Sequence, residues 1–429
     1  MLPIYHWNSA EIAEYLQSLD HRGSHFDPAV EARVATTLSA VRSEGDAALR
    51  RFTLEYDQVD LKTLRVSESE ICSLANQVDP ELRHILKLAK ENIRRFHEHQ
   101  LERSWEYEMA DGVRLGQRIR PIQSVGLYVP GGTAAYPSSV LMNAIPAQIA
   151  AVPRIAVATP YHQFRSNPVI AAVLQELELF EVYGIGGAQA IAALAYGTES
   201  VPKVDKIVGP GNVYVATAKR QVFGTVDIDM IAGPSEVVVV ADDSVDPAFV
   251  AADLMAQAEH DEKACAVAIV VSEDLARAIA QQLQDQIVKL SRGNVIRSSL
   301  NSFGAIIVCK DWDAVVEAVN HIAPEHLELL LEDGEALSER IHSAGAIFFG
   351  PFSCEPVGDY FAGPNHVLPT SGTARFASPL GVYDFLKRTS LIKYSEAALR
   401  RNHRFIEKFA EAEKLDAHAQ SVRIRIKDS

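Results

Sequence analysis

Apolar residues recur at every third or fourth position through much of the first hundred residues of the chain. Between residues 80 and 98 this stripe consists of Leu82, Ile85, Leu86, Ala89, Ile93 and Phe96. The spacing predicts a helix with one buried face, and Pro80 stands where its first turn would begin. Charged residues occupy the opposite face, so we interpret the stripe as core. Residues 1–110 are expected to form a helical N-terminal segment.

A different pattern follows residue 111, where short apolar runs alternate with helical segments. The runs predict strands at residues 124–132, 154–159, 180–183 and 205–208. The segments between them predict helices at residues 169–177, 188–196 and 213–222. Such alternation is typical of a parallel sheet with helices on its faces. We therefore predict a first α/β domain over residues 111–234.

The same alternation starts again at residue 236 and predicts a second α/β domain over residues 235–380. Strands are expected at residues 236–241, 264–271, 304–308 and 346–349, and helices at residues 247–259, 273–290 and 312–321. The predicted fold class is α/β, with two successive open, Rossmann-like modules.

The alternation ends after Thr370. Residues 371–382 are rich in Gly, Ser and Thr and predict a loop, whereas residues 396–414 predict a helix with Leu399, Phe405, Ile406 and Phe409 on one face. Residues 422–427 alternate as a half-exposed strand does. We expect residues 381–429 to form a small C-terminal lobe.

The composition favours a small-molecule substrate in a reducing compartment. The 429 residues carry a net charge of −15, which argues against a nucleic-acid surface because phosphate binding needs clustered Lys and Arg. The four cysteines are scattered without C-x-x-C spacing. The apolar window 138–160 is interrupted by Pro and polar residues, and the N-terminus lacks the design of a signal peptide. We expect a cytoplasmic protein without a membrane span.

Two glycine-bearing segments follow expected strands of the first α/β domain. Residues 184–189 read GIGGAQ and open a helix, but Gln189 stands where the dinucleotide fingerprint has its final Gly. Residues 209–212 read GPGN and bring glycines and the Asn212 amide to a strand end. Each segment is either a nucleotide-binding loop or an ordinary tight turn. Their shared place at carboxyl strand ends favours a ligand crevice.

Several polar residues of the second half are candidates for metal binding or proton transfer. Gln257 and His260 lie one turn apart near the end of an apolar helix, where they either ligate a metal or cap the helix. Glu325 and His326 provide two adjacent proton-transfer groups. The alternative for this pair is the first turn of a helix after Pro324, with Glu325 near the helix dipole and His326 on the surface.

Four later residues have weaker patterns. Asp359 and His366 lie in a segment with Gly and Pro, where they either ligate a metal or stabilise turns. Glu413 continues the apolar face of the last predicted helix, and His418 follows that helix. A carboxylate on an apolar face suggests a partner or ligand, and a solvent-exposed helix end is the alternative.

Taken in order, these segments resemble the histidinol dehydrogenase family. The resemblance covers most of the chain and is strongest between residues 126 and 395. Its motifs are GPSE at 233–236, APEHLE at 323–328, GDYFAGPNHVLPT at 358–370 and KRTSLIKY at 387–394. Glu413 and His418 complete the ordered set.

The resemblance implies a role for each matching position. It implies one zinc ion per subunit, with Gln257, His260, Asp359 and His418 as ligands, and catalytic proton transfer by Glu325 and His326. NAD would contact Tyr128, Gln189 and Asn212. The substrate would contact Ser235, Gln257, His260, His326, Asp359, Glu413 and His418.

The implied reaction is a four-electron oxidation of L-histidinol through L-histidinaldehyde to L-histidine, the last step of histidine biosynthesis, with two NAD used in succession. The resemblance further implies a homodimer in which the C-terminal lobe brings Glu413 and His418 to the neighbour's site. Two alternatives remain at this point. One is an enzyme for other diols or amino alcohols, against which Glu413 argues because it suits a cationic or imidazole-bearing substrate. The other is a zinc-stabilised binding protein without catalysis.

Overall fold

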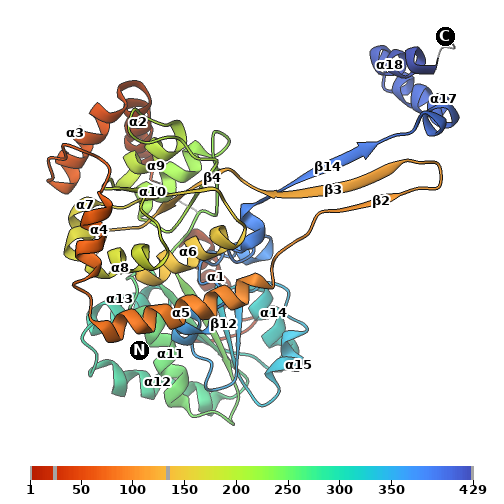
Figure 1. The fold of residues 1–429 in the computed structure, drawn as a ribbon. Coiled ribbons are helices and arrows are strands. Elements are labelled where there is room, and N and C mark those ends of the chain that lie inside the picture. Colours follow the sequence, from red (N-terminus) through yellow and green to blue (C-terminus); the bar gives the residue numbers. More distant parts are fainter. Residues whose placement is uncertain (1, 23–26, 132–135, 427–429) are drawn as a thin grey trace.

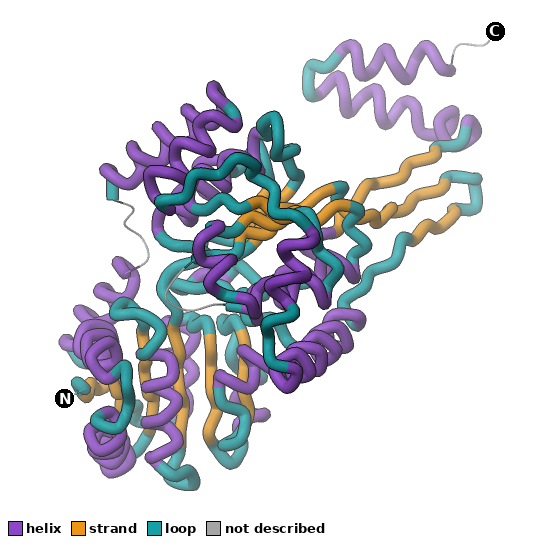
Figure 2. The backbone as a smooth tube through the Cα atoms, turned by 60° about the vertical axis from the view of Figure 1, so that its left-hand side comes forward, coloured by secondary structure: helices purple, strands orange, loops and turns teal. Residues whose placement is uncertain are grey.

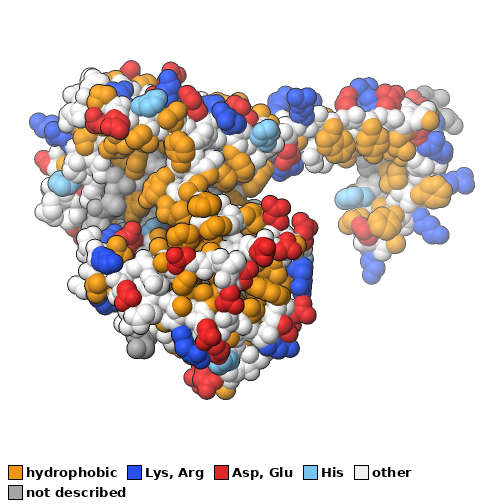
Figure 3. Space-filling view, turned by 90° about the horizontal axis from the view of Figure 1, so that it is seen from below, with side chains coloured by type: hydrophobic (Ala, Val, Ile, Leu, Met, Phe, Trp, Pro, Cys, Tyr) orange, Lys and Arg blue, Asp and Glu red, His pale blue; other side chains and the backbone are white. Residues whose placement is uncertain are grey.

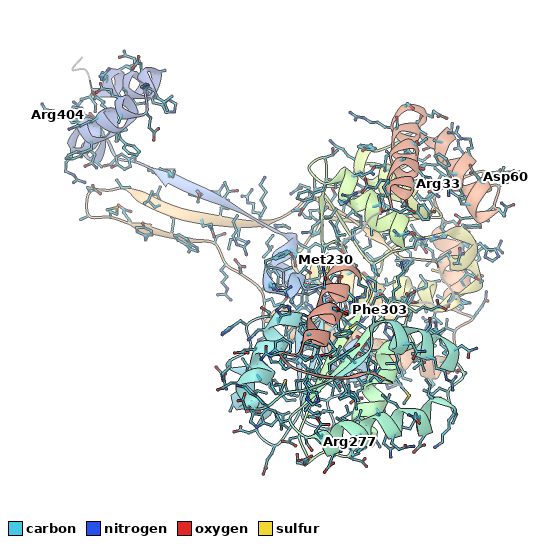
Figure 4. All side chains as sticks on the ribbon, turned by 180° about the vertical axis from the view of Figure 1, so that it is seen from behind. Arg33, Asp60, Met230, Arg277, Phe303 and Arg404 are labelled. Atoms are coloured by element: carbon cyan, nitrogen blue, oxygen red, sulfur yellow. The ribbon has the colours of Figure 1, made fainter. Side chains whose placement is uncertain are left out.

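Two parallel sheets, each covered by helices, form the body of the protein, and a long antiparallel arm extends from it (Figure 1). The computed structural model describes residues 2–22, 27–131 and 136–426. The side-chain stick view places Met230 and Phe303 near the junction of the two sheet layers (Figure 4).

The first sheet has five strands in the order β6-β5-β4-β7-β8, all parallel. The strands are β4 (Ser124–Tyr128), β5 (Arg154–Ala158), β6 (Val182–Tyr183), β7 (Lys206–Val208) and β8 (Asp227–Ile228). The chain moves outward from β4 to β6 and then returns to the other side of β4 at β7. Ligands of open α/β sheets bind beyond the carboxyl ends of strands at such a reversal.

Helices cover both faces of this sheet because its strands are apolar on both sides. One face carries α4 (Glu68–Ala75), α5 (Pro80–Glu98), α6 (Pro137–Ile149) and α8 (Pro168–Glu176), and α7 (Tyr161–Ser166) precedes α8. The other face carries α2 (Pro28–Glu44), α3 (Asp46–Asp57), α9 (Gly187–Tyr196) and α10 (Val213–Val222).

The second sheet has six parallel strands in the order β1-β11-β10-β9-β12-β13. The strands are β1 (Ile4–His6), β9 (Glu236–Ala241), β10 (Cys265–Val270), β11 (Ala305–Val308), β12 (His326–Leu330) and β13 (Ala346–Phe349). Apart from β1 at the edge, this order repeats that of the first sheet, with the reversal between β9 and β12. The α/β fold class and the two Rossmann-like modules are confirmed.

Two helical layers enclose the second sheet. One contains α11 (Pro247–Ala258), α12 (Glu273–Ile287) and α13 (Gly293–Phe303), and the other contains α1 (Ala10–Arg22), α14 (Trp312–Ile322) and α15 (Gly334–Ser338). Shorter turns follow the last strand. They are α16 (Glu355–Val357), the π-helical turn η1 (Gly358–Ala362), and the 3-10 turns η2 (Thr373–Arg375) and η3 (Val382–Phe385).

The N-terminal segment is divided between the two sheets. β1 and α1 belong to the second sheet, whereas α2 to α5 cover the first. The predicted stripe on α5 is only partly core, because Ile85 and Phe96 are 45% and 40% exposed. The division into residues 1–110, 111–234, 235–380 and 381–429 remains a proposal.

The arm consists of three antiparallel strands in the order β14-β3-β2, namely β2 (Trp105–Glu108), β3 (Arg114–Pro121) and β14 (Leu386–Lys393). At its tip lie α17 (Glu396–Ala412) and α18 (Asp416–Ile426), separated from the body (Figures 1 and 2). The two helices therefore follow a paired strand, β14, which the patterns in residues 381–429 did not predict.

The strand expected at residues 422–427 was wrong for the part that the structure describes. Residues up to Ile426 belong to α18, and Lys427 lies outside the described residues. α18 packs against α17, and Arg423 donates to Glu407 and to Glu411. A helix forms its backbone hydrogen bonds internally, whereas a strand at this position would need a neighbouring strand. Among the described residues no helix is long and apolar enough to cross a membrane.

Candidate active site

The loops that follow β4, β5 and β6 converge at the carboxyl edge of the five-stranded sheet. A Cβ on Gly131 or Gly186 would lie 2.8 or 2.5 Å from Pro160 Cγ, so both loops lie directly against the loop after β5. The Gly187 N–H donates to Tyr128 Oη over 3.0 Å. Gln189, in the first turn of α9, is buried. The strand-to-helix context expected for the GIGGAQ segment is confirmed.

The GPGN segment closes the other side of the same edge. Gly209 has a φ of 115°, and a Cβ there would lie 2.1 Å from the Tyr128 carbonyl oxygen, so only glycine fits. The carbonyl of Gly209 accepts from Lys219 Nζ over 2.9 Å. Asn212 caps α10 by accepting from the N–H groups of Tyr214 and Val215. Tyr128 and Gln189 are thus buried beside these loops, whereas Asn212 is exposed at the start of α10.

A second group of polar residues gathers at the amino edge of the six-stranded sheet. Glu236 opens β9, and His326 opens the neighbouring strand β12. Gln257 and His260 come to the same edge because α11 runs back against the direction of β9 before β10 begins. Ser235 precedes β9, and its carbonyl accepts from the Cys265 N–H over 3.0 Å.

Glu325 and His326 are buried at the start of a strand. Their exposed fractions are 5% and 4%, so the hypothesis of a helical first turn with a surface histidine was wrong. Pro324 ends a connection, and side chains of β12 then alternate between the two faces of the sheet. Leu327 and Leu329 point into the core that β12 shares with α14. His326 points to the opposite face of the sheet.

Hydrogen bonds fix both side chains on the start of β9. The Glu236 N–H donates to Glu325 Oε2 over 2.9 Å, and His326 Nδ1 donates to the Glu236 carbonyl over 3.2 Å. That donation leaves Nε2 with its lone pair. Nε2 has no hydrogen-bond partner in the described part of the chain and lies 3.9 Å from Asp359 Oδ1.

Burial shifts the pKa of each of these groups toward the neutral form. Burial raises the pKa of Glu325 well above its ordinary value, and the charge of Glu236 raises it further. Burial lowers the pKa of His326 to about 3. Arg22 Nη2 donates to Glu236 Oε2 over 2.8 Å. The imidazole of His326 is therefore neutral near pH 7, with the lone pair on Nε2.

One nitrogen and two carboxylates lie close enough to bind a common metal ion. The ligand atoms of His260, Glu355 and Asp359 lie within 4.8 Å of one another. With its nitrogen turned toward Glu355, the Gln257 amide donates to Glu355 Oε2 over 3.1 Å and to the Glu236 carbonyl over 3.2 Å. This orientation turns the amide oxygen away from Glu355.

The electrostatics of this cluster fit a cation. Glu355 is 2% exposed, and burial together with the charges of Asp359 and Glu325 raises its pKa well above the ordinary value. Burial also raises the pKa of Asp359 to about 6. Buried carboxylates at such spacing repel one another unless a proton or a metal ion lies between them. Imidazole nitrogen, carboxylate and amide oxygen are ligand types that zinc accepts.

The sequence patterns did not single out Glu355, which belongs to this cluster, or Glu328, which lies behind it, and they left the role of His366 open. The Glu355 N–H donates to Glu328 Oε1 over 2.7 Å, and burial and the charge of Asp253 raise the pKa of Glu328 to about 10. The alternation of His326 and Glu328 with Leu327 and Leu329 was a signal for this strand. Glu355 itself gave no recognisable spacing.

His366 connects the cluster of His260, Glu355 and Asp359 to the other sheet layer. Its Nδ1 donates to the Asp359 carbonyl over 3.1 Å, and Ser139 of α6 donates to its Nε2 over 3.4 Å. Because α6 follows β4, Ser139 belongs to the carboxyl edge of the five-stranded sheet. The Gly233 N–H also donates to Thr370 Oγ1 over 2.6 Å. The carboxyl edge of one sheet thus faces the amino edge of the other.

The remaining two candidates lie elsewhere in the single chain. Glu413 caps the end of α17, and His418 lies in α18 at the tip of the arm. Figures 1 and 2 show this tip apart from the body. The structure therefore brings Gln257, His260 and Asp359 together and leaves His418 away from them.

Comparison with known proteins identifies what this arrangement is similar to. The family model described as histidinol dehydrogenase matches residues 20–426. A histidinol dehydrogenase of Halalkalibacterium halodurans is 51% identical, over 92% of this chain and 93% of that protein. One from Heliobacterium mobile is 49% identical, over 99% of this chain and 100% of that protein. The solved structure of histidinol dehydrogenase from Elizabethkingia anophelis superposes with a TM-score of 0.93 at 36% identity, covering 99% and 98% of the two chains.

Proposed function

The chain belongs to the histidinol dehydrogenase family and is an oxidoreductase of histidine biosynthesis, and we propose that it acts with zinc, NAD and residues of two subunits. The substrate is L-histidinol, which is oxidised through the aldehyde to L-histidine. The observation that carries this proposal is the buried, neutral His326, whose free Nε2 faces Asp359 between the two sheet edges.

Gln257, His260 and Asp359 hold the zinc ion together with His418 of a second subunit. The closeness of His260 and Asp359, and the contact of Gln257 with Glu355 of the same cluster, support this set. Bound zinc would act as a Lewis acid without redox activity and hold the amino alcohol in one pose. Ser235, His326 and Glu413 complete the substrate contacts.

NAD lies along the carboxyl edge of the five-stranded sheet, where Tyr128, Gln189 and Asn212 contact it. The tight approach of Gly209 to Tyr128 and the exposed Asn212 at the start of α10 support this position, because ligands of open α/β sheets bind beyond the carboxyl ends of the strands. The nicotinamide end must approach the other sheet, since the hydride comes from a substrate held there.

Two proton transfers accompany the two hydride transfers. His326 Nε2 would take the hydroxyl proton as the alcohol is oxidised to the aldehyde, and bound NAD would accept the hydride. Glu325 in its ionised form would then take a proton from water as the water oxygen bonds to the aldehyde carbon. Protonated His326 would give its proton to the carbonyl oxygen, which yields the hydrate. Oxidation of the hydrate to the acid would release the second hydride, which a second NAD would accept when bound. The shared anchor on Glu236 holds both groups at the start of β12 during these steps.

The separated arm supports a shared site. Exposed apolar side chains gather on its helix pair, namely Phe405, Ile406, Phe409, Leu415 and Ile424. The body exposes Phe352 and Phe376, which are 87% and 83% accessible. Figure 3 shows hydrophobic side chains on both parts. Exchange of arms between identical chains would bury such surfaces symmetrically and bring Glu413 and His418 to the neighbour's cluster.

The test of function is the formation of NADH from histidinol and NAD, followed by its absorbance. Histidinol should yield about two NADH per molecule oxidised, and chelation should remove the activity until zinc is restored. Full activity of a metal-free preparation would contradict the proposed role of zinc. Metal analysis should find one zinc per chain.

The shared site is tested by mixing two inactive variants. Under conditions where dimers re-form, His418→Ala and Asp359→Ala subunits should combine into dimers with one intact and one doubly damaged site. Differential tags identify the mixed dimers. Activity should return if ligands come from both subunits, and its absence in confirmed mixed dimers would assign the whole site to one chain.

A further inference from the structure

The five-stranded sheet lacks an acidic residue where dinucleotide-binding sheets usually carry one. In such folds a carboxylate at the end of the second strand accepts hydrogen bonds from the ribose of NAD. The second strand here is β5, and the residues that follow it are Thr159, Pro160, Tyr161, His162 and Gln163. This position therefore offers no carboxylate of its own.

Asp57 approaches the same edge from a distant part of the sequence. It is the last residue of α3, whose side chains share a core with Tyr128, Ala158 and Tyr183. The segment after it pairs with the end of β6, because the Gly184 N–H donates to the Leu64 carbonyl and the Val66 N–H to the Val182 carbonyl. This pairing is antiparallel, so the residues before Leu64 continue past the carboxyl edge of the sheet.

One oxygen of the partly exposed Asp57 carboxylate accepts no hydrogen bond from the part of the chain that the structure describes. Its Oδ2 is buried and has no hydrogen-bond partner within the described residues. Burial raises the pKa of this carboxyl, and the charge of His162 partly opposes that shift. The charge of Asp57 contributes to the raised pKa of Tyr128. Asp57 is thus close to the residues after β5 and to a proposed NAD contact. A buried carboxylate oxygen without a donor is costly unless a ligand supplies one.

The position of Asp57 indicates which half of NAD it meets. α3 lies on the outer side of the five-stranded layer, away from the second sheet, and Asp60 just beyond it is at that outer flank (Figures 1 and 4). The nicotinamide must lie at the opposite end, where His366 and Ser139 join the two layers. The adenosine half then extends toward Asp57.

We propose that Asp57 accepts hydrogen bonds from the adenosine ribose hydroxyls of the dinucleotide and thereby selects NAD over NADP. This inference rests on the proposed use of a nicotinamide dinucleotide. The 2′-phosphate of NADP would place its negative charge against the carboxylate and remove the hydroxyl donor, so both effects favour NAD.

The experiment measures NADH binding by fluorescence titration without substrate, and steady-state rates with histidinol. Asp57→Asn should weaken NADH binding about tenfold to a hundredfold, the range expected for hydrogen bonds to a charged group. The rate at saturating NAD should stay within about twofold, and the preference for NAD over NADP should fall at least about tenfold. The control is Asp60→Asn, which makes the same charge change at an exposed position and should leave all three quantities unchanged.

A cofactor analogue tests the same contact in the unaltered protein. An NAD analogue without the adenosine 2′-hydroxyl should bind the wild-type protein more weakly than NAD by a similar factor, and Asp57→Asn should bind both equally. If the wild-type protein binds the analogue as tightly as NAD, the inference is overturned whatever the variant's stability. If the wild-type protein neither binds nor reduces NAD, the proposed function itself fails.

Discussion

The two parallel sheets share one strand order, yet their candidate site residues lie at opposite edges. In the five-stranded sheet the carboxyl edge carries loops with glycines, and the contacts there are largely those of backbone groups. In the six-stranded sheet the amino edge carries buried ionisable side chains. Strand order therefore does not by itself fix the edge at which the site residues of an α/β module lie.

The physical difference lies in what each edge can present. Loops after parallel strands turn free N–H groups and close backbone toward a long, charged ligand. The starts of β9 and β12 instead hold side chains of fixed direction, and the end of α11 brings two more to them. Proton transfer needs groups held in place and removed from water, which this second edge provides.

The largest effect is expected at the amino edge of the six-stranded sheet. His326→Gln should lower the rate of histidinol oxidation by about 10²–10⁴, because glutamine cannot accept the hydroxyl proton. Steady-state NADH formation measures this loss. His342→Gln, at an exposed position, is the matched control and should retain the wild-type rate. A variant at His326 with the wild-type rate would remove this edge from the chemistry.

Glu325→Gln should separate the two half-reactions. The aldehyde step is expected to fall by about 10² or more, because activation of water needs the carboxylate, while the alcohol step should fall less. Each step is measured separately, with the aldehyde supplied for the second. Equal losses in both would contradict the assignment of separate roles to Glu325 and His326.

The carboxyl edge of the five-stranded sheet should respond to a change in backbone space. In Gly209→Ala the new Cβ would meet the Tyr128 carbonyl, so NADH binding should weaken by about tenfold or more and the melting temperature should fall. Gly224→Ala is the matched control, because Gly224 also has a positive φ, of 96°, but a Cβ there meets nothing within 4 Å. Equal effects of the two substitutions would show that backbone strain, and not the close approach, is responsible.

The smallest effect concerns stability rather than activity. In metal-free protein His326 stays neutral down to a pKa of about 3, whereas in the unfolded chain it takes a proton below about pH 6.5. A lowered folded pKa means that its contribution to stability decreases as pH falls through this range. Between pH 7.5 and 5.0, wild-type protein should lose about 2 kcal/mol of unfolding free energy relative to His326→Gln. Denaturant unfolding of both proteins, with a chelator present at both pH values, measures this difference. If wild-type protein and His326→Gln lose equal unfolding free energy, the lowered pKa of His326 is contradicted.

Patterns along the chain were enough to predict the local elements and the chemical candidates. Short apolar runs located β9 and β10, and the helical pattern between them located α11, within a few residues, because these patterns depend on neighbours along the chain. The ordered motifs identified the family. They also singled out Gln257, His260 and Asp359, which the structure brings together.

Only the tertiary structure decided which edges meet and which acids lie behind the site. Arg22 pairs with Glu236 across 214 positions, and the Glu355 N–H donates to Glu328. No periodic pattern along the chain predicts either contact. The arm was missed for the same reason, since β14 pairs with β3 from a distant part of the chain. Local patterns show which face of a helix or strand is apolar. Which sheet edges meet depends instead on how elements distant in sequence pack together. At those edges the cost of burying a charge is offset by partners that lie far away in sequence.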